Sequence, residues 1–259
     1  GYAHLDLPVF ADAIHAAGAL TVLLRDAIMP NLLQTIEHVP ALVHAGPFAN
    51  IAHGNSSILA DEIALRCADY VVTEAGFGAD MGFEKFCHIK CRVSHRRPDA
   101  AVLVATVRAL KAHSGRFAVV PGRPIDPRIQ QPDVAAVRAG APNLAKHVEN
   151  IARFNLPCVV AVNRFPADAP EELAAVADAA RAAGAFAVVV SEAHARGGPG
   201  AAPLAEAVVR AAEPSHRPPF RFLYEQDQPI KKKIETVAAE IYGADGVDYA
   251  PAASAAADA

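Results

Sequence analysis

The stretch that decides the fold runs from Cys158 to Ser191 and reads CVVAVNRFPADAPEELAAVADAARAAGAFAVVVS. An almost continuous apolar run over 158–163 is followed by a polar turn, an Ala-rich segment with helical spacing, and a second apolar run over 186–191. Short apolar runs rich in Val are typical of strands that are covered on both faces. The order therefore predicts a strand, a helix and a second strand parallel to the first.

Both ends of the expected helix carry sequence signals. Asp168 is the expected N-cap, and Pro170 suits the first helical position. Glu171 and Glu172 lie in the first turn, where the helix dipole favours negative charge. The helix is expected to end at Gly184, because glycine readily adopts the left-handed conformation that closes many helices.

The same alternation of apolar runs and Ala-rich segments recurs along the chain and predicts the α/β class, with mostly parallel sheets flanked by helices in two α/β units. The further expected strands are at 41–45, 70–73 and 101–106. The further expected helices are at 56–67, 132–138, 144–154, 201–212 and 230–242.

Pro and Gly cluster between residues 120 and 142, where the hydrophobic periodicity fades. We therefore expect a first domain over 1–142 and a second α/β domain over 143–247. The remaining residues, 248–259, are rich in Ala and Asp and are expected to form a disordered tail.

Composition and charge exclude several classes of protein. The 259 residues include 24 Lys and Arg against 28 Asp and Glu, a net charge of −4, which excludes a nucleic-acid-binding protein that relies on bulk positive charge. With 53% hydrophobic residues the chain is too apolar for intrinsic disorder. No apolar run reaches the roughly 18–20 residues of a membrane span, and the sequence does not start like a signal peptide. Four cysteines suit a reducing compartment, so we expect a cytoplasmic protein without a membrane partner.

Ligands of open parallel sheets bind beyond the carboxyl ends of the strands, so the loops after the strands are the places to search. The first such loop, 44–57, contains two Gly, two Asn, two His and two Ser. His53 and Asn55 are its candidate ligand residues, and Asn55 or Ser56 is the expected cap of the following helix. The alternative is a structural loop whose polar side chains, His44 included, satisfy its own backbone.

The second loop, 73–86, is rich in glycine. Gly76, Gly78 and Gly82 permit unusual backbone conformations, and Phe77 lies between two of them. An aromatic side chain held between glycines suggests stacking on a planar ligand. The alternative is that Phe77 folds back into the core.

Charged residues and cysteines follow this loop. Lys90 is a candidate ligand contact, and a solvated helix face is the alternative for such a run of mixed charges. Cys87 and Cys91 have a spacing that two zinc ligands on one helix can have, but no second pair follows at a usual interval. We therefore expect no metal site.

The third candidate site is formed by the loops after 158–163 and 186–191. A right-handed crossover places these loops on adjacent strands, so Phe165 and His194 are expected to face each other across one cleft. Two flat side chains can clamp an aromatic heterocycle, and Arg196 can meet a negatively charged tail. The alternative is two unrelated surface loops.

Two common catalytic motifs are missing from the sequence. It contains no Gly-x-x-x-x-Gly-Lys-[Ser/Thr] phosphate loop and no Gly-x-Ser-x-Gly nucleophile turn. The residues by themselves therefore indicate only an α/β ligand-binding protein or part of an enzyme.

Several long motifs resemble formate–tetrahydrofolate ligase, also called formyltetrahydrofolate synthetase, and follow one another in the order of that family. They are PNLLQTIE at 30–37, HAGPFANIAHGNSS at 44–57, DYVVTEAGFGADMG at 69–82, IKCR at 89–92, VATVRALK at 104–111 and IYGADGV at 241–247. The resemblance implies a P-loop-nucleotidase-like parent fold without its phosphate loop. Residues 1–142 would be the C-terminal portion of its large catalytic and nucleotide-binding domain, and 143–247 a second domain with the folate-cleft loops.

The activity that the resemblance implies is the ATP-dependent ligation of formate to tetrahydrofolate, which gives 10-formyltetrahydrofolate for one-carbon metabolism. Formate attacks the γ-phosphate of ATP, and N10 of tetrahydrofolate then attacks the carbonyl of the resulting formyl phosphate. Positioning and charge stabilisation supply most of the acceleration in such steps. The resemblance further implies ATP with Mg²⁺, a monovalent cation, and a homo-oligomer.

The resemblance also assigns residues to the catalytic site. Glu74, Phe77 and Gly78 match the family segment near formyl phosphate and folate, which implies catalytic and substrate-positioning roles. His53, Asn55, Lys90 and Arg196 are grouped as candidates for phosphate or other ligand contacts.

A folate clamp is implied by the two loops of the third candidate site. Phe165 matches the aromatic residue that stacks on the pterin, and His194 stands where the family usually carries Trp on the other side. Glu192 is grouped with them as a substrate-binding residue.

The family's phosphate loop and its formyl-phosphate-binding Arg lie upstream of position 1, and its C-terminal part follows residue 247. We therefore expect the chain alone not to make formyl phosphate. The alternative is a non-catalytic folate-binding or oligomer-interface module derived from the ligase.

Overall fold

The computed structural model describes residues 9–258 with the exception of 11, 46–54, 121 and 217. The contacts within the chain divide it into two compact units. Unit 1 comprises residues 1–48 and 55–74, and unit 2 comprises residues 49–54 and 75–259. Each unit is described by itself.

Unit 2 is built on a parallel sheet of β3 (Ala101–Ala105), β4 (Cys158–Asn163) and β5 (Ala187–Ser191), in that order. The register pairs Ala101 with Cys158 at one end of the sheet and Asn163 with Ser191 at the other. The predicted strand–helix–strand unit is therefore confirmed, and the expected bounds of these three strands agree to within one residue. The fold class is α/β, as predicted.

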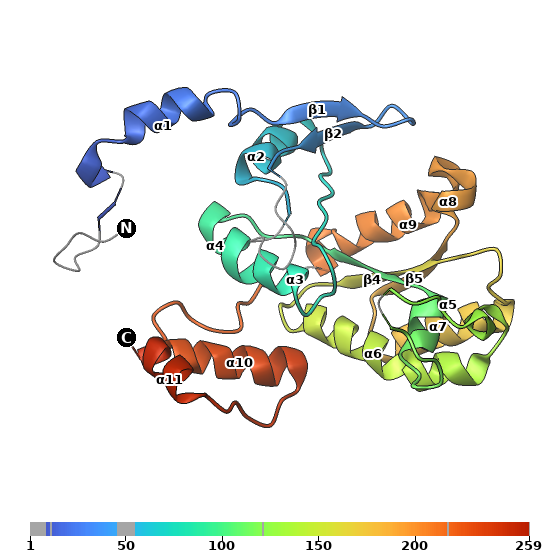
Figure 1. Ribbon diagram of the computed structural model, residues 1–259. Helices are drawn as coiled ribbons and strands as arrows, with labels where there is room; N and C mark the ends of the chain where they lie inside the picture. The colour runs from blue at the N-terminus through green and yellow to red at the C-terminus, as the bar shows by residue number, and fades with distance from the viewer. Residues whose placement is uncertain (1–8, 11, 46–54, 121, 217, 259) are drawn as a thin grey trace. The chain divides into compact units, whose positions relative to one another are not determined.

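Helices cover both faces of this sheet. α6 (Val134–Ala152) and α7 (Pro170–Ala182) lie on one face, and α9 (Gly198–Ala211) lies on the other (Figure 1). Alternate residues of β4 explain this arrangement, because successive side chains of a strand point to opposite faces. Val160 belongs to the cluster under α6 and α7, whereas Val159 packs against α9.

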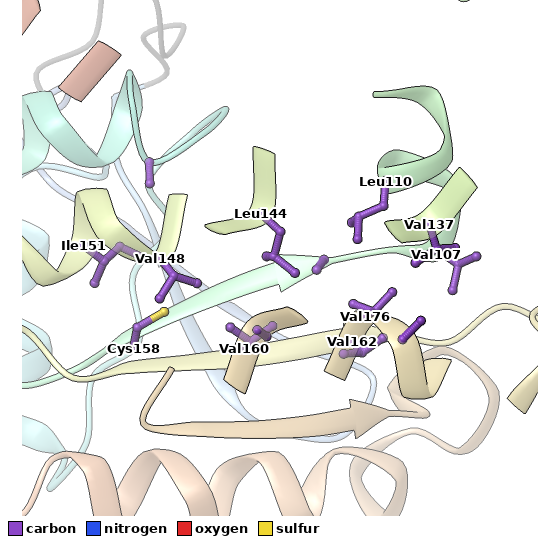
Figure 2. Close-up of a cluster of buried hydrophobic side chains, with 14 of the residues drawn as sticks. Val107, Leu110, Val137, Leu144, Val148, Ile151, Cys158, Val160, Val162 and Val176 are labelled. Carbon is purple, nitrogen blue, oxygen red and sulfur yellow. The ribbon is translucent and has the colours of Figure 1, made fainter. Parts of the chain in front are cut away.

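The larger core lies between β3, β4 and the helices α5 (Val107–Ala112), α6 and α7. Figure 2 shows this cluster, with Val148 near Cys158 at the amino end of β4 and Val107 beyond the carboxyl end of β3, near Val137 and Leu110. The side chains are completely or almost completely removed from water. Their burial accounts for the near-continuous apolar run of β4.

α6 is one helix where the sequence predicted two, at 132–138 and 144–154. Pro142 lies inside it and lacks a backbone N–H, yet the helix continues through this position. The residues around Pro142 are small because α6 packs closely on α5 there. A Cβ added at Gly140 would lie only 1.8 Å from the Leu110 carbonyl oxygen.

α7 begins and ends nearly as predicted, but its N-cap is Ala169 instead of Asp168. The Glu172 carboxylate reaches back to the backbone N–H of Ala169 at 3.1 Å. The Asp168 carboxylate instead accepts a hydrogen bond from the backbone N–H of Phe165. Gly184 follows the helix with φ +90°, the left-handed conformation expected there.

The other elements of unit 2 are shorter or lie at its ends. They are α3 (Gly82–Lys85), a π-helical turn (Phe86–Lys90), α4 (Cys91–Ser94), 3₁₀ turns (Pro127–Gln130 and Pro214–His216), α8 (Ala193–Arg196), α10 (Ile230–Tyr242) and α11 (Pro251–Asp258). The helix expected at 230–242 is confirmed. α11 lies in the stretch for which a disordered tail was predicted.

Unit 1 contains a 3₁₀ turn (Asp12–Ile14), α1 (Ala17–Leu24), the antiparallel pair β1 (Asn31–Gln34) and β2 (Pro40–Val43), and α2 (Ile58–Cys67). The strand predicted at 70–73 is wrong, because these residues form no strand. β2 overlaps the strand predicted at 41–45 and begins one residue earlier.

The predicted boundary near residue 143 falls inside α6, whereas the contacts within the chain separate unit 1 from unit 2 near residue 75. The domain limits 1–142 and 143–247 therefore stay predictions about the family's architecture. Among the described residues, no helix has the length and apolar character needed to span a membrane.

Candidate functional site

The loops after β4 and β5 start side by side. Asn163 and Ser191 are paired in register at the carboxyl ends of the two strands. One residue further on, the backbone N–H of Arg164 donates to the Ser191 carbonyl at 3.1 Å. The parallel pairing therefore brings both loops to one edge of the sheet, as the sequence predicted.

Glu192 connects the two loops through its side chain. One carboxylate oxygen accepts from Arg164 Nη1 at 2.7 Å, and the other accepts from Arg196 Nη1 at 3.1 Å. The hydrogen bond from Arg196, together with Arg164, lowers the pKa of Glu192. Glu192 thus stays ionised and holds two arginine side chains at this edge.

Phe165 lies at the tip of a tight turn after β4. Its N–H donates to Asp168 Oδ2 at 2.8 Å, and its carbonyl accepts from the Asp168 N–H at 3.0 Å. The ring is half-buried. The Arg108 guanidinium lies 5.2 Å from the ring centroid, in range for a cation–π contact.

Arg108 is a site residue that the sequence analysis did not single out. It belongs to α5, which directly follows β3, so the third strand of the sheet also contributes to this edge. The sequence could have indicated Arg108, because it lies just beyond the carboxyl end of a predicted strand, where ligands of parallel sheets bind. The structure thus gathers Arg108, Phe165 and Glu192 from the segments that follow three neighbouring strands.

His194 lies in α8 and is exposed to solvent. Gly200 has a packing role, because a Cβ there would lie 2.4 Å from the Glu192 carbonyl oxygen. The strand order supports the predicted neighbourhood of the Phe165 and His194 loops. A clamp between the two rings stays a prediction.

The glycine-rich loop holds Phe77 in the left-handed region with φ +62°, a conformation that is uncommon for a bulky side chain. Phe77 is 72% exposed, so the core alternative is wrong. Gly82 packs against backbone, since a Cβ there would lie 1.7 Å from the Gly76 carbonyl oxygen. The exposed ring and its backbone conformation agree with the predicted binding role, which stays a prediction.

Gly78 adjoins Asp80 and His147, the latter from α6. A Cβ at Gly78 would come within 2.3 Å of Asp80 Oδ1 and 2.9 Å of His147 Cε1. His147 Nδ1 is buried, has no hydrogen-bond partner, and lies 4.0 Å from Asp80 Oδ1. Burial, the largest cause, lowers the pKa of His147.

The described contacts place the Phe77 loop and the Phe165 loop in different surroundings. The Phe77 loop packs against His147 of α6 and is joined to α10 by a hydrogen bond from the Tyr242 hydroxyl to the Asp80 carbonyl. The Phe165 loop lies at the carboxyl edge of the sheet. Glu74 belongs to unit 1 and is exposed.

The remaining candidates differ in their surroundings. His53 lies outside the described residues. Asn55 is half-buried, but the cap of α2 is Ser57, whose Oγ accepts from the Ala60 N–H at 3.0 Å, so neither predicted cap is correct. Lys90 is 5% exposed, which rules out a solvated position for its side chain.

His44 fits the structural alternative for its loop. Its Nε2 lies 2.8 Å from the Ala27 carbonyl oxygen, which can only accept, so Nε2 carries the proton. Its Nδ1 then accepts from the Ser57 hydroxyl at 2.6 Å. Both ring nitrogens are satisfied within unit 1.

Cys87 and Cys91 are buried, and burial raises the pKa of the Cys87 thiol well above its ordinary value. A thiol in such a place is a poor metal ligand, because the thiolate is the binding form. Among the described residues, no three His, Cys, Asp or Glu side chains lie close enough together to hold a metal ion.

A parallel sheet whose carboxyl edge gathers aromatic and charged loops is the arrangement of a ligand-binding α/β domain. A family model described as formate–tetrahydrofolate ligase matches residues 1–259. The chain therefore belongs to the formate–tetrahydrofolate ligase family.

Curated relatives agree with this assignment. A protein from Roseiflexus castenholzii named formate–tetrahydrofolate ligase is 58% identical over 247 residues, which cover 95% of this chain and 43% of the relative. Relatives of the same name from Saccharopolyspora erythraea and Cutibacterium acnes are 57% and 52% identical, over 98% of this chain and 44% and 45% of their own lengths. The chain thus spans less than half the length of these relatives.

Proposed function

We propose that this chain is the folate-binding portion of an ATP-dependent formate–tetrahydrofolate ligase, in which Phe165 stacks on the pterin ring of tetrahydrofolate. The observation that carries this proposal is the convergence of Arg108, Phe165 and Glu192 at the carboxyl edge of one parallel sheet. Membership of the ligase family supports the choice of ligand.

The residues at this edge suit the chemistry of the ligand. A pterin is planar and stacks on an aromatic face. The contact with the Arg108 guanidinium holds the Phe165 ring, while Arg164 and Arg196, both paired with Glu192, supply positive charge at the same edge of the sheet. Arginines favour carboxylates because their planar fork donates two parallel hydrogen bonds, which suits the glutamate end of tetrahydrofolate.

The overall reaction requires groups beyond those assigned to this edge. Formate is first phosphorylated by ATP, and N10 of tetrahydrofolate then attacks formyl phosphate. The sequence contains no phosphate-binding loop of the usual pattern, so we expect the chain to bind folate without turning over ATP. The described residues offer no cluster for Mg²⁺, and we assign no metal or monovalent-cation site.

The other predicted residues keep supporting roles in this proposal. Phe77 and Gly78 form an exposed, conformationally unusual loop suited to substrate contact. Glu74 stays a candidate catalytic residue, and Asn55 and Lys90 are candidates for contacts with the small anionic substrates.

Calorimetric titration of the chain with tetrahydrofolate under anaerobic conditions tests the proposal. We expect measurable binding, and Phe165→Ala should weaken it by roughly 1–3 kcal/mol through lost stacking and burial. Phe186→Ala is the matched control, because Phe186 is a partly exposed ring that precedes β5 at the opposite end of the sheet. Absence of binding by the unaltered chain, or equal affinity of the chain and Phe165→Ala, would contradict the proposal.

The alternative, an oligomer-interface module, is favoured by the surface of unit 1. Large apolar side chains are exposed on its described residues, including Val22, Leu23, Leu32 and Ile36. Exposed apolar surface of this kind marks interaction sites. Light scattering of the isolated chain tests this alternative, since a concentration-independent monomer contradicts it.

A further inference from the structure

Lys111 and Glu172 form an ion pair inside unit 2. Lys111 of α5 is 2% exposed, and Glu172 in the first turn of α7 is completely buried. The Lys111 ammonium contacts Glu172 Oε1 directly. Buried charges need both a counter-charge and partners for their remaining hydrogen-bonding positions.

The lysine side of the pair is satisfied by backbone. Lys111 Nζ donates to the carbonyl oxygens of Ile129 and Gln131 at 3.1 and 2.8 Å. With Glu172 as the third acceptor, all three protons of the ammonium have partners. Through Lys111, the segment between α5 and α6 is thereby linked to Glu172 of α7.

The carboxylate side holds two backbone N–H groups. Glu172 Oε1 accepts from the Asp133 N–H at 2.7 Å, and Oε2 accepts from the Ala169 N–H at 3.1 Å. Burial raises the pKa of Glu172, but the hydrogen bonds from Asp133, Lys111 and Ala169 outweigh burial and lower it. The carboxylate is therefore ionised and has both oxygens engaged.

Ala169 is the last residue before α7 and adjoins the turn that carries Phe165. On one side of Phe165, the Arg164 N–H donates to the Ser191 carbonyl. On the other side, the Ala169 N–H donates to the Glu172 carboxylate. Between them the turn is closed by the two hydrogen bonds of Phe165 with Asp168. Glu172 thus holds one of the two ends of the Phe165 turn.

We propose that the buried Lys111–Glu172 pair positions Phe165 for stacking on a planar ligand. A pair of apolar residues would fill the same space at equal or lower cost in stability. Unlike apolar residues, the ion pair fixes the orientation of the groups around it. Lys111 orients the carboxylate, which then accepts from the Asp133 N–H with one oxygen and from the Ala169 N–H with the other. This inference rests on the proposed function for the ligand, and the geometry of the turn is testable without one.

Glu172→Gln is the most selective change. The carboxamide has nearly the same shape but only one acceptor oxygen. Lys111 and the Asp133 N–H both require that oxygen, so the amide NH₂ group faces the Ala169 N–H and this hydrogen bond is lost. The variant therefore releases the Phe165 turn while the other contacts are kept.

Amide hydrogen exchange measured by NMR reports the release without any ligand. We expect exchange at Ala169 and Phe165 to rise about tenfold relative to the amides of β4, which is the effect of losing one hydrogen bond. Val148→Ala is the control, because it destabilises the same core at the other end of the sheet (Figure 2). In this control the amides of the turn and of β4 are expected to change together.

Two exchange results would overturn the proposal. Faster exchange at Ala169 with Phe165 unchanged would show that the turn holds its shape without Glu172. Equal acceleration in the turn and in β4 would show a purely structural role. If Glu172→Gln does not fold, the double variant Lys111→Met with Glu172→Leu removes both charges and every acceptor at position 172, so the hydrogen bond of the Ala169 N–H is lost and the same comparison applies.

Titration with tetrahydrofolate separates this inference from the proposed function. If the unaltered chain binds, Glu172→Gln should raise the dissociation constant about tenfold, and Val148→Ala should leave it unchanged. Equal affinities of Glu172→Gln and the unaltered chain would contradict positioning. If the unaltered chain does not bind, the proposed function fails, and the exchange measurement alone decides whether the pair positions Phe165.

Discussion

The Arg164 guanidinium lies 2.7 Å from the Glu192 carboxylate, and this ion pair joins the loop after β4 to the loop after β5. Arg196 shares the same carboxylate from the other side. The three side chains are substantially exposed, so their ion pairs contribute little to the free energy of unfolding. Their effect is to hold two arginines at the carboxyl edge of the sheet.

Glu192→Ala is expected to affect binding far more than stability. Without the shared carboxylate, Arg164 and Arg196 repel each other and lose their common position, so the affinity for tetrahydrofolate should fall by about three- to tenfold. The free energy of unfolding should change by less than about 1 kcal/mol, as for other exposed pairs. Calorimetric titration and urea unfolding measure the two effects. Asp178→Ala, which removes an exposed Arg181 partner on α7, should change neither.

His194→Trp is expected to tighten the binding of tetrahydrofolate. Indole offers a larger stacking face than imidazole, and an improved aromatic contact contributes about 0.5–1.5 kcal/mol. Titration of the variant measures this gain. Ala195→Trp is the control, because Ala195 is an exposed neighbour in the same short helix. Weaker binding by His194→Trp, or an equal gain in both variants, would mean that His194 does not occupy the clamp position.

Gly140→Ala is expected to destabilise unit 2. The added Cβ would lie 1.8 Å from the Leu110 carbonyl oxygen, so α5 and α6 must move apart. Overpacking of this kind costs about 1–3 kcal/mol, which exceeds the gain of up to about 1 kcal/mol from replacing glycine inside a helix. Urea unfolding measures the difference. Gly246→Ala adds the same methyl group where nothing lies within 4 Å and should leave stability nearly unchanged.

His147 is expected to make the stability of unit 2 depend on pH. Burial is the main cause that lowers its pKa in the folded chain, with Asp80 opposing and His113 assisting. The unfolded chain, with a histidine pKa of about 6.5, therefore binds the proton more readily. The stabilisation by neutral His147 is present above about pH 6.5 and is lost as the pH falls through the lower, folded pKa.

His147→Gln should flatten the decline of the urea midpoint in acid. The matching change His216→Gln, at an exposed histidine in a 3₁₀ turn, should leave the decline as it is. If His147→Gln and the unaltered chain decline with the same slope, burial of His147 does not control the pH dependence.

Local pattern was sufficient to predict the three strands of unit 2 and its helices α7, α9 and α10. β4 and α10 were predicted residue for residue, because a continuous apolar run and a helical period are set by side chains close in sequence. The single helix α6 was predicted as two, because the small residues around Pro142 look like a helix break in the sequence. In the structure they are small because α6 packs closely on α5 at this point. The apolar stretch 70–73 was predicted as a strand, but these residues form none. A strand needs a neighbouring strand to pair with, and an apolar composition does not show whether one is present.

The candidate site was predicted in part. Phe165, Glu192 and Arg196 follow two strands that the sequence identifies, and parallel pairing was sufficient to bring their loops together. Arg108 was not singled out, because its contact with Phe165 spans two strands and 57 positions of sequence. Lys90 was expected on a solvated face or at a ligand, and its burial depends on packing that no local pattern reveals.

The order of residues by itself determined the α/β class, the three parallel strands and the membership of the ligase family, since all three depend on patterns read along the chain. Only the tertiary structure decided which charges pair. Lys111 and Glu172 lie 61 positions apart and meet where both side chains are buried, so that each charge requires the other. The packing of the helices on the sheet decides which side chains meet over such a distance. The same packing places Glu172 against the Ala169 N–H and so fixes one end of the turn that carries Phe165.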